Sequence, residues 1–540
     1  MTGWGLKAMH QSASHRNPAY IPTPSPLIQI RFAGRGHAQA ASGRNEGMTK
    51  AHIDVPALVR NYVGGHWTDP SGGRAPITDP ATGHAISEIG ISTPADVAHA
   101  VDLAQAAFPA WRATPPVERA RPLFRLKHLM ETHFEELSQL ITLDHGKTID
   151  DARGEVRRAI ENVEVACGIP TLMMGYGLED GAARGIDEHM IRQPLGVFAA
   201  IVPFNFPLMV PFWFWPYAVA CGNPYIIKPS EQDPLVLVRI FELIDQCGFP
   251  TGVINMVQGQ RDAVDALLDD PRIQGISFVG SSPVAKYIYS RASANGKRVQ
   301  AQGGAKNALV VMPDAVPLVT PAITNIIGSC FGAAGQRCLA GSILLTVGDA
   351  HDKAMDGLLS VSRNLKVGDG ADPAIDVGPV ISGASRDRIF KAIDDGVASG
   401  AHLVLDGRHP TVAGPNAGGY FVGPTIFDGV KPDNALAQTE IFGPVLSVAN
   451  VPTLDAAIDW INASPFGNAA SLYTGSGKAA RDFRFKVVAG NIGINVGVAA
   501  AMAFFPFAGM KQSFFGTLHG QGRDAVEFFT DKKVYIERWF

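Results

Sequence analysis

The chain has 540 residues, which is too long for one ordinary hydrophobic core and favours two or three packed domains. Its 46 basic and 50 acidic residues give a formal net charge of −4, so it lacks the positive surface that nucleic-acid binding requires. The cysteines are odd in number and never spaced as CxxC, which argues against a disulfide framework and a zinc site. We therefore expect a protein that acts on a small molecule in a reducing compartment, without a metal.

The first 47 residues differ in composition from the rest. They are basic, contain no acidic residue before Glu46, and carry prolines at positions 18, 22, 24 and 26. A basic, acid-poor start resembles a transit peptide, but the prolines would break the amphipathic helix of such a peptide. We expect residues 1–47 to be a disordered extension of a cytoplasmic protein. If they are a transit peptide, the protein would lie in the mitochondrial matrix.

Residues 195–227 contain no charged side chain and imitate a membrane span by hydropathy. Five prolines interrupt the stretch, and each removes a backbone donor that lipid cannot replace. The stretch therefore predicts a buried strand, loop and helix of a protein core, with no membrane contact.

Short apolar runs alternate with helical patterns along the rest of the chain. A helix-rich segment at 95–167 comes first. One later helix should start with Asp233 as N-cap and end near Gly248, a second should open at Pro283, and a third should begin at about Pro321. The predicted strands are 197–202, 225–228, 253–257, 275–279, 308–312 and 342–346. This order predicts a doubly wound α/β domain followed, after Lys306, by a second α/β domain.

Several common catalytic motifs are missing. No GxGxxG fingerprint follows a predicted strand, no GxSxG elbow occurs, and GKT at 146–148 lacks the earlier P-loop glycine. The sequence therefore does not support phosphoryl transfer or α/β-hydrolase chemistry.

Cys338 ends the segment FGAAGQRC at 331–338. Small side chains leave room around its sulfur and Arg337 adds a positive charge, and both features favour an accessible thiolate. A lone cysteine is more often a small buried hydrophobic residue, so a catalytic role needs support from other segments.

Two other segments provide that support. Asn205 lies between prolines and aromatic residues at 203–207, where its amide could stabilise an oxyanion, although it could equally form a turn. Lys228 and Glu231 follow a predicted strand, where α/β sheets bind ligands, although a solvated loop would explain them as well.

Taken together, these segments resemble the aldehyde dehydrogenase superfamily from about Arg60 to the C-terminus. The motifs occur in the family's order: PFNFP at 203–207, IIKPSE at 226–231, FVGS at 278–281, GQRC at 335–338 and EIFGP at 440–444. The resemblance implies an NAD-dependent enzyme in which Cys338 is the nucleophile, and Asn205 with the Cys338 backbone N–H forms the oxyanion hole.

The resemblance also implies how the cofactor binds. Lys228 and Glu231 would bind the adenosine ribose, Ser281 would lie near the phosphates, and Glu440 with Phe442 would hold the nicotinamide ribose. Val202 and Phe204 should line the same cleft, and Gln232 stands where a related branch usually has an arginine. Glu231 would repel a 2′-phosphate, which favours NAD over NADP.

The implied architecture is an aldehyde dehydrogenase-like α/β fold with a Rossmann-type domain, a catalytic domain and a small oligomerisation element. We expect the NAD-binding domain at 48–171 and 193–305 and the catalytic domain at 306–500. Residues 172–192 and 501–540 would form the oligomerisation element of a homotetramer.

One departure from the superfamily concerns the general base. Most members carry a glutamate where this chain has Gln302, in QGGAK at 302–306. An amide cannot take a proton from water, so we expect the Cys338 thioester to leave with the thiol of coenzyme A. The chain resembles the branch of methylmalonate-semialdehyde dehydrogenases, which acylate coenzyme A in valine catabolism, in GAKN at 304–307 and in the arginine of GQRC.

That branch acts on substrates with a second carboxylate, which Arg158 and Arg337 would bind. Each could contribute roughly 1.5–3 kcal/mol through charge-assisted hydrogen bonds, although Arg158 alone could be a surface charge. The expected reaction converts malonate or methylmalonate semialdehyde to acetyl-CoA or propionyl-CoA with loss of carbon dioxide. A hydrolytic aldehyde dehydrogenase and a catalytically silent protein of the same fold remain as alternatives.

Overall fold

The computed structural model describes residues 54–540, with the side chains of residues 316–320 left out, and these residues fall in one compact unit. The predicted extension at 1–47 lies outside the described residues. None of the helices in the described part of the chain has the length and apolar composition needed to cross a bilayer.

The first large sheet has eight strands in the order β22-β12-β11-β8-β9-β10-β2-β3. Its five central strands are parallel, and β22, β2 and β3 are antiparallel additions at the edges. The central strand β8 (VFAAI) is apolar and buried along its whole length, as is typical of a parallel strand covered on both faces. The strands are β22 (Phe514–Gly516), β12 (Arg298–Gln302), β11 (Ile273–Val279), β8 (Val197–Ile201), β9 (Tyr225–Lys228), β10 (Ile254–Met256), β2 (Asn61–Val63) and β3 (His66–Thr68).

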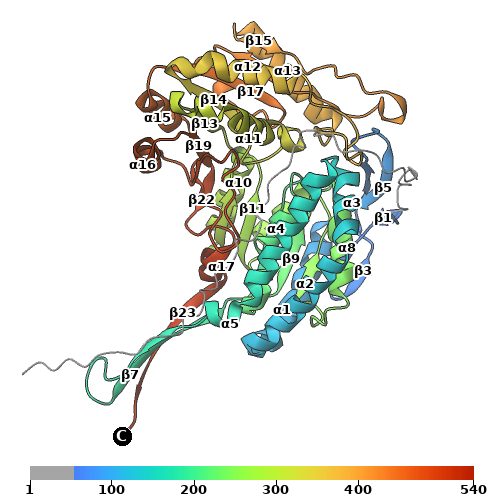
Figure 1. Ribbon diagram of the computed structural model, residues 1–540. Helices are drawn as coiled ribbons and strands as arrows, with labels where there is room; N and C mark the ends of the chain where they lie inside the picture. The colour runs from blue at the N-terminus through green and yellow to red at the C-terminus, as the bar shows by residue number, and fades with distance from the viewer. Residues whose placement is uncertain (1–53) are drawn as a thin grey trace, which may run out of the picture. The chain divides into compact units, whose positions relative to one another are not determined.

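Helices cover both faces of this sheet (Figure 1). Alternate residues of β8 point to opposite faces, so Phe198 and Ala200 belong to one apolar core and Val197 and Ala199 to the other. The first core is packed by α2 (Pro116–Thr132), α3 (Phe134–His145), α4 (Ile149–Cys167), α7 (Trp215–Cys221), α8 (Leu235–Ile244) and α17 (Gly522–Phe529). The second is packed by α1 (Pro94–Ala113), α9 (Arg261–Asp269) and α10 (Ser282–Ala294).

The second large sheet has seven strands in the order β15-β16-β17-β14-β13-β19-β20, all parallel except β15. It forms its own apolar core with the helices between its strands. The strands are β15 (His402–Leu405), β16 (Thr425–Asp428), β17 (Val445–Val451), β14 (Gly341–Val347), β13 (Asn307–Val311), β19 (Ala469–Tyr473) and β20 (Asn491–Ile494). The helices are α11 (Val319–Phe331), α12 (His351–Ser362), α13 (Gly383–Ala398), α15 (Leu454–Ala463) and α16 (Gly477–Lys486).

Three strands form an arm that projects from the helices and sheets (Figure 1). β23 (Thr530–Arg538) pairs antiparallel along the full length of β7 (Ile186–Pro194), and β6 (Tyr176–Leu178) pairs with the other edge of β7. The remaining strands form two small sheets, β1 (Leu58–Val59) with β5 (Ala85–Gly90) and β4 (Arg74–Thr78), and β18 (Phe466–Gly467) with β21 (Met510–Lys511). Short helices α5 (Ile169–Leu172), α6 (Met209–Phe212) and α14 (Ala435–Gln438) complete the fold.

The predicted α/β architecture is confirmed, and each predicted strand occurs within about two residues of its expected bounds. The charge-free stretch at 195–227 is buried as a strand, a loop and short helices, as expected. One prediction for α8 was wrong. Asp233 is not its N-cap, because the helix begins at Leu235, whose N–H donates to Asp144 Oδ2 at 2.8 Å.

Candidate active site

A cavity of about 960 Å³ lies at the carboxyl ends of the parallel strands β8, β9, β11 and β12. Ligands bind at this edge of open α/β sheets, because loops diverge there and helices begin there. All predicted site residues except Arg158 and Arg337 line it, namely Val202, Phe204, Asn205, Lys228, Glu231, Gln232, Ser281, Cys338, Glu440 and Phe442. The structure thus brings together the motifs that the sequence separates.

Cys338 enters this cavity through an unusual turn after α11. Ala333 and Ala334 have φ of 48° and 51°, a left-handed conformation that costs a residue with a Cβ roughly 1–2 kcal/mol. Gly335 follows at φ 70°, and a Cβ there would meet the carbonyl oxygen of Gly443 at 2.2 Å. The turn is strained, so contacts from elsewhere in the fold must hold it.

The backbone of Cys338 is fixed by two buried amides. Asn307 Nδ2 and Asn468 Nδ2 donate to the Cys338 carbonyl oxygen at 2.8 Å and 2.7 Å. The strand β13 begins at Asn307, and Asn468 immediately precedes β19. Two strands of the second sheet therefore set where the sulfur lies.

The thiol of Cys338 is not predisposed to ionise. Burial raises its pKa to about 12, the negative charge of Glu440 adds to the rise, and Arg337 opposes it only weakly. Arg337 therefore lowers the pKa of the thiol, as expected, but burial and Glu440 outweigh its effect. The Arg337 guanidinium pairs with Asp151 and donates to the Gly328 carbonyl at 3.1 Å, so its charge is largely compensated.

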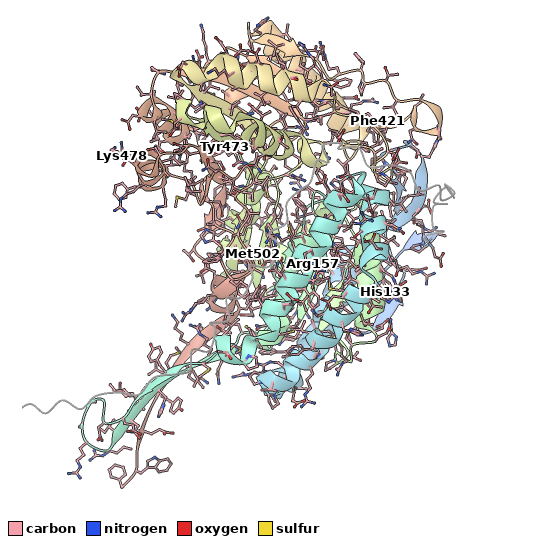
Figure 2. All side chains as sticks on the ribbon, viewed as in Figure 1. His133, Arg157, Phe421, Tyr473, Lys478 and Met502 are labelled. Atoms are coloured by element: carbon pink, nitrogen blue, oxygen red, sulfur yellow. The ribbon has the colours of Figure 1, made fainter. Side chains whose placement is uncertain are left out.

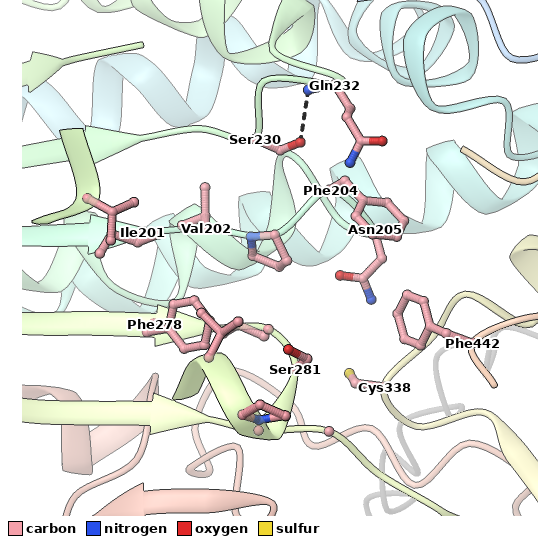
Figure 3. Close-up of a pocket in the computed structure, with 18 of the residues that line it drawn as sticks. Ile201, Val202, Phe204, Asn205, Ser230, Gln232, Phe278, Ser281, Cys338 and Phe442 are labelled. Atoms are coloured by element: carbon pink, nitrogen blue, oxygen red, sulfur yellow. Dashed lines mark hydrogen bonds between the residues drawn. The ribbon is translucent and has the colours of Figure 1, made fainter. Parts of the chain in front are cut away.

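Asn205 faces Cys338 in the cavity, with its side-chain amide directed toward the sulfur (Figure 3). The ammonium of Lys147 donates to the Asn205 carbonyl oxygen at 2.7 Å and to Glu155 Oε2 at 2.6 Å. Glu155 Oε1 accepts from the backbone N–H groups of Leu208 and Met209 at 2.8 Å and 3.1 Å. A buried ion pair thus fixes the loop that carries the amide.

The other end of the cavity offers groups suited to a dinucleotide. Lys228 Nζ donates to the Gly259 carbonyl at 2.7 Å and lies 3.4 Å from Glu231 Oε2. Ser281 is the N-cap of the 13-residue helix α10, and its side chain makes no capping hydrogen bond. Exposed N–H groups at such a helix start attract phosphate. Gln232 N donates to Ser230 Oγ at 3.1 Å beside this end (Figure 3).

Glu440 and Phe442 enter from the segment between α14 and β17. Glu440 Oε1 accepts from Ala305 N at 3.0 Å, and burial raises the pKa of its carboxyl to about 7. A Cβ at Gly304 would meet Glu440 Oε2 at 2.4 Å, so a larger residue there would displace the Glu440 carboxylate. Phe442 lies edge-on to Phe204 with ring centroids 5.8 Å apart. The two rings narrow the cavity near Cys338.

Gln302 is the last residue of β12 and is 3% exposed. Its Nε2 donates to the Phe507 carbonyl at 2.8 Å, while its Oε1 has no hydrogen-bond partner among the described residues. Its side chain is held by backbone and does not line the cavity.

The structure does not bring the two predicted substrate arginines into the cavity lining. Arg158 is paired with Glu161 at 3.0 Å, and its Nη1 lies 2.9 Å from the sulfur of Met502. Figure 2 labels Met502 together with Arg157, the neighbour of Arg158 on α4. Each arginine already has an internal carboxylate partner.

Other residues near the site were not predicted. Arg388 of α13 lines the cavity, and its Nη1 donates to the Ile441 carbonyl beside Glu440. Lys147, Asp151 and Glu155 form hydrogen bonds and ion pairs that hold the segments carrying Asn205 and Cys338. The sequence analysis considered GKT at 146–148, which contains Lys147, only as a possible P-loop. The role of Lys147 could not be predicted from the local sequence, because it depends on a contact with the distant Asn205.

Comparisons with known proteins agree with this geometry. The profile described as the aldehyde dehydrogenase family matches residues 67–535. Malonate-semialdehyde dehydrogenase 2 of Geobacillus thermodenitrificans is 49% identical over 481 residues, covering 89% of this chain and 99% of the relative. Malonate-semialdehyde dehydrogenase 2 of Geobacillus kaustophilus is 47% identical over 482 residues, with the same coverage of both chains.

Two solved structures are also similar. A methylmalonate-semialdehyde dehydrogenase of Oceanimonas doudoroffii superposes with a TM-score of 0.88 at 43% identity, covering 90% of this chain and 99% of the other. A protein of Sinorhizobium meliloti assigned to the same enzymes and complexed with NAD gives 0.87 at 41% identity, covering 89% and 98%. The chain therefore belongs to the aldehyde dehydrogenase family.

Proposed function

We propose that the protein oxidises malonate or methylmalonate semialdehyde with NAD and transfers the acyl group from Cys338 to coenzyme A. The observation that carries this proposal is that Cys338 and Asn205 line one cavity. In the sequence, Gln302 stands where the resemblance implies a glutamate base, and its amide is held by the Phe507 carbonyl outside the cavity lining. The names of the similar malonate- and methylmalonate-semialdehyde dehydrogenases support the same substrates.

In the proposed reaction, the Cys338 thiolate adds to the aldehyde carbon and the carbonyl oxygen becomes an alkoxide. The Asn205 side chain and the Cys338 backbone N–H donate hydrogen bonds to that oxygen, whose charge exists only after addition. NAD in this cavity would supply the hydride acceptor, and the positive charge of its oxidised ring would lower the pKa of a nearby thiol. Departure of the hydride leaves a thioester on Cys338.

The β-carboxylate then leaves as carbon dioxide, and its electron pair is stabilised by the thioester carbonyl until the carbon is protonated. The thiolate of coenzyme A attacks the thioester carbonyl and Cys338 leaves as thiolate. The products are acetyl-CoA or propionyl-CoA. Gln302 cannot activate water for the competing hydrolysis, because its amide does not accept a proton at neutral pH.

For the substrate's second carboxylate, we propose Arg158 and Arg337. Both guanidinium groups are partly buried and can form charge-assisted hydrogen bonds. Because Glu161 and Asp151 already pair with them, the substrate would share the guanidinium protons with these carboxylates.

We propose that NAD binds in this cavity in the orientation that the resemblance implies. Lys228 and Glu231 would bind the adenosine ribose, the start of α10 at Ser281 would hold the phosphates, and Glu440 would receive the nicotinamide ribose. The carboxylate of Glu231 favours a free 2′-hydroxyl over a 2′-phosphate.

We further propose the domain roles given above, with the arm as part of the oligomerisation element of a homotetramer. β23 and the chain end expose large apolar side chains, at Val534, Ile536, Trp539 and Phe540. Such a surface is typical of a protein interface. β22 from the same C-terminal range instead extends the first sheet, and Phe528 and Phe529 of α17 pack on Phe198.

Product analysis tests the proposed function. Each semialdehyde is incubated with NAD, with and without coenzyme A, and the acyl products are identified by mass spectrometry. We expect acetyl-CoA and propionyl-CoA, one NADH for each, and no activity in Cys338→Ala, which should still bind NAD. Free acid as the main product in the presence of coenzyme A would contradict the proposal.

A further inference from the structure

Helix α4 carries two carboxylates on one face, and each contacts a different half of the proposed catalytic site. Asp151 and Glu155 are four residues apart, which places them on the same side of the helix. Glu155 accepts from Leu208 N and Met209 N, in the loop that carries Asn205. Asp151 Oδ2 accepts from Ala333 N at 2.9 Å, in the turn that leads to Cys338.

The turn before Cys338 needs an external partner because its own residues disfavour its conformation. Ala333 and Ala334 both have a Cβ and both lie in the left-handed region. Asp151 holds the N–H of the first of them and pairs with Arg337, the residue before Cys338. Arg337 also donates to the Gly328 carbonyl of α11. A single carboxylate thus links both ends of the strained turn.

We infer that Asp151 is a positioning residue for the nucleophile, and that α4 sets the separation of Cys338 from Asn205 through Asp151 and Glu155. The inference rests on the proposed function, because it takes Cys338 as nucleophile and Asn205 as oxyanion donor. Asp151 does not line the cavity, so it acts on the turn and not on the substrate. A shift of about 1 Å at a reacting group can lower a rate by about a hundredfold.

The neighbouring aspartate provides a matched control. The Asp150 side chain is 83% exposed and pairs with Arg153 at the surface, whereas the Asp151 side chain is 20% exposed. Both lie in the first turn of α4, so replacing either by asparagine removes the same charge from the positive end of the helix. A difference between the two variants reports the contacts of Asp151 with the turn.

The experiment compares Asp151→Asn with Asp150→Asn and the wild type. Propanal is the aldehyde, because it has no carboxylate and separates positioning from substrate recognition by Arg337. The rate constant of the NADH burst is measured by rapid mixing, together with the dissociation constant for NAD and the midpoint of thermal unfolding. We expect the burst of Asp151→Asn to slow by about ten- to a hundredfold, with NAD affinity and thermal midpoint close to those of Asp150→Asn.

Each outcome decides the inference. If Asp151→Asn gives the NADH burst at the rate of the wild type, the inference is overturned and the proposed function stays intact. A wild type that gives no burst with either propanal or methylmalonate semialdehyde overturns the proposed function and the inference with it. If Asp151→Asn does not fold, Arg337→Lys decides. This variant keeps the positive charge but loses the guanidinium that bonds to both Asp151 and the Gly328 carbonyl. It should slow the propanal burst to a similar extent.

Discussion

Asn205 and Cys338 approach each other from different sheets, and each is fixed through its backbone. Lys147 holds the carbonyl of Asn205, and two asparagines hold the carbonyl of Cys338. Their side chains are therefore free to act on a substrate while their positions are set by the fold. This preorganisation is what oxyanion stabilisation requires.

Replacement of Asn205 by alanine should lower kcat by about a hundredfold to a thousandfold, because one oxyanion donor is lost. Steady-state kinetics with saturating NAD and coenzyme A measures the effect, and NAD affinity should be unchanged. A variant with the kcat of the wild type would show that the amide does not contact the reacting oxygen.

Arg158→Leu should reduce kcat/KM for methylmalonate semialdehyde far more than for propanal, since only the former offers a carboxylate to bind. Arg157→Leu is the matched control on the same helix, because Arg157 lies 3.9 Å from Glu131 and has its side chain 43% exposed. Equal losses on both aldehydes would assign Arg158 a structural role only.

Glu440 makes stability depend on pH. Burial raises the pKa of its carboxyl from the usual 4.5 to about 7, so the folded protein holds this proton more tightly than the unfolded chain. As pH rises from below 5 to above 7, ionisation of Glu440 should destabilise the folded state. Glu440→Gln should therefore gain stability relative to the wild type over this range. Thermal unfolding at a series of pH values would contradict this account if the difference between the two proteins stayed constant.

At the scale of elements, helix α4 supports the site, because it contacts both segments that carry Asn205 and Cys338. Its N-terminal turn contacts the Cys338 turn, its second turn contacts the Asn205 loop, and Arg158 follows on the third. The preceding Lys147 adds to this support with a fully buried ammonium that also lies 4.3 Å from the centre of the Phe206 ring.

Lys147→Met should lower the midpoint of thermal unfolding strongly, because it leaves the carboxylate of Glu155 buried without its cation. Breaking such a pair costs about 3–5 kcal/mol, whereas removing both charges costs less. Lys147→Met/Glu155→Gln should therefore be more stable than Lys147→Met alone. A double variant that is less stable than either single variant would show that the pair is not the source of the effect.

Strands such as β8 were predictable because a parallel strand covered on both faces forms a continuous apolar run. The parallel strand β12 was not predicted, because Arg298, Gln300 and Gln302 interrupt such a run. The start of α8 was less predictable. Asp233 has the usual N-cap residue type, yet Asp144 from α3 supplies the capping oxygen, and this contact depends on tertiary packing. Burial instead raises the pKa of the Asp233 carboxyl.

Within the site, residues carried by local motifs were predicted and those joined by long-range contacts were not. Asn205, Glu440 and Cys338 lie in recognisable segments, but Asp151 meets Ala333 from 182 positions away along the chain. Alanine has no preference for the left-handed region, so the turn at 333–335 could not be inferred from residue type. The ion pair of Arg337 with Asp151 was not foreseen either, because the two residues are 186 positions apart along the chain.

At the scale of the whole molecule, the site combines contributions from two sheets. Loops of the eight-stranded sheet line one end of the cavity, with Lys228 and Glu231, while the segments around the seven-stranded sheet provide Cys338, Glu440 and Phe442. In the proposed account, the cofactor and the nucleophile are held by different parts of the fold. The fate of the thioester then depends on whether water or a thiol reaches it.

Rapid mixing of the wild-type enzyme with NAD and methylmalonate semialdehyde, in the absence of coenzyme A, tests that claim most directly. Because Gln302 cannot activate water, NADH should appear in a burst equal to the enzyme concentration and then slow as the Cys338 thioester accumulates. Addition of coenzyme A should restore rapid turnover in a ping-pong pattern. Fast steady turnover without coenzyme A would contradict the account, because a base other than residue 302 would then be activating water.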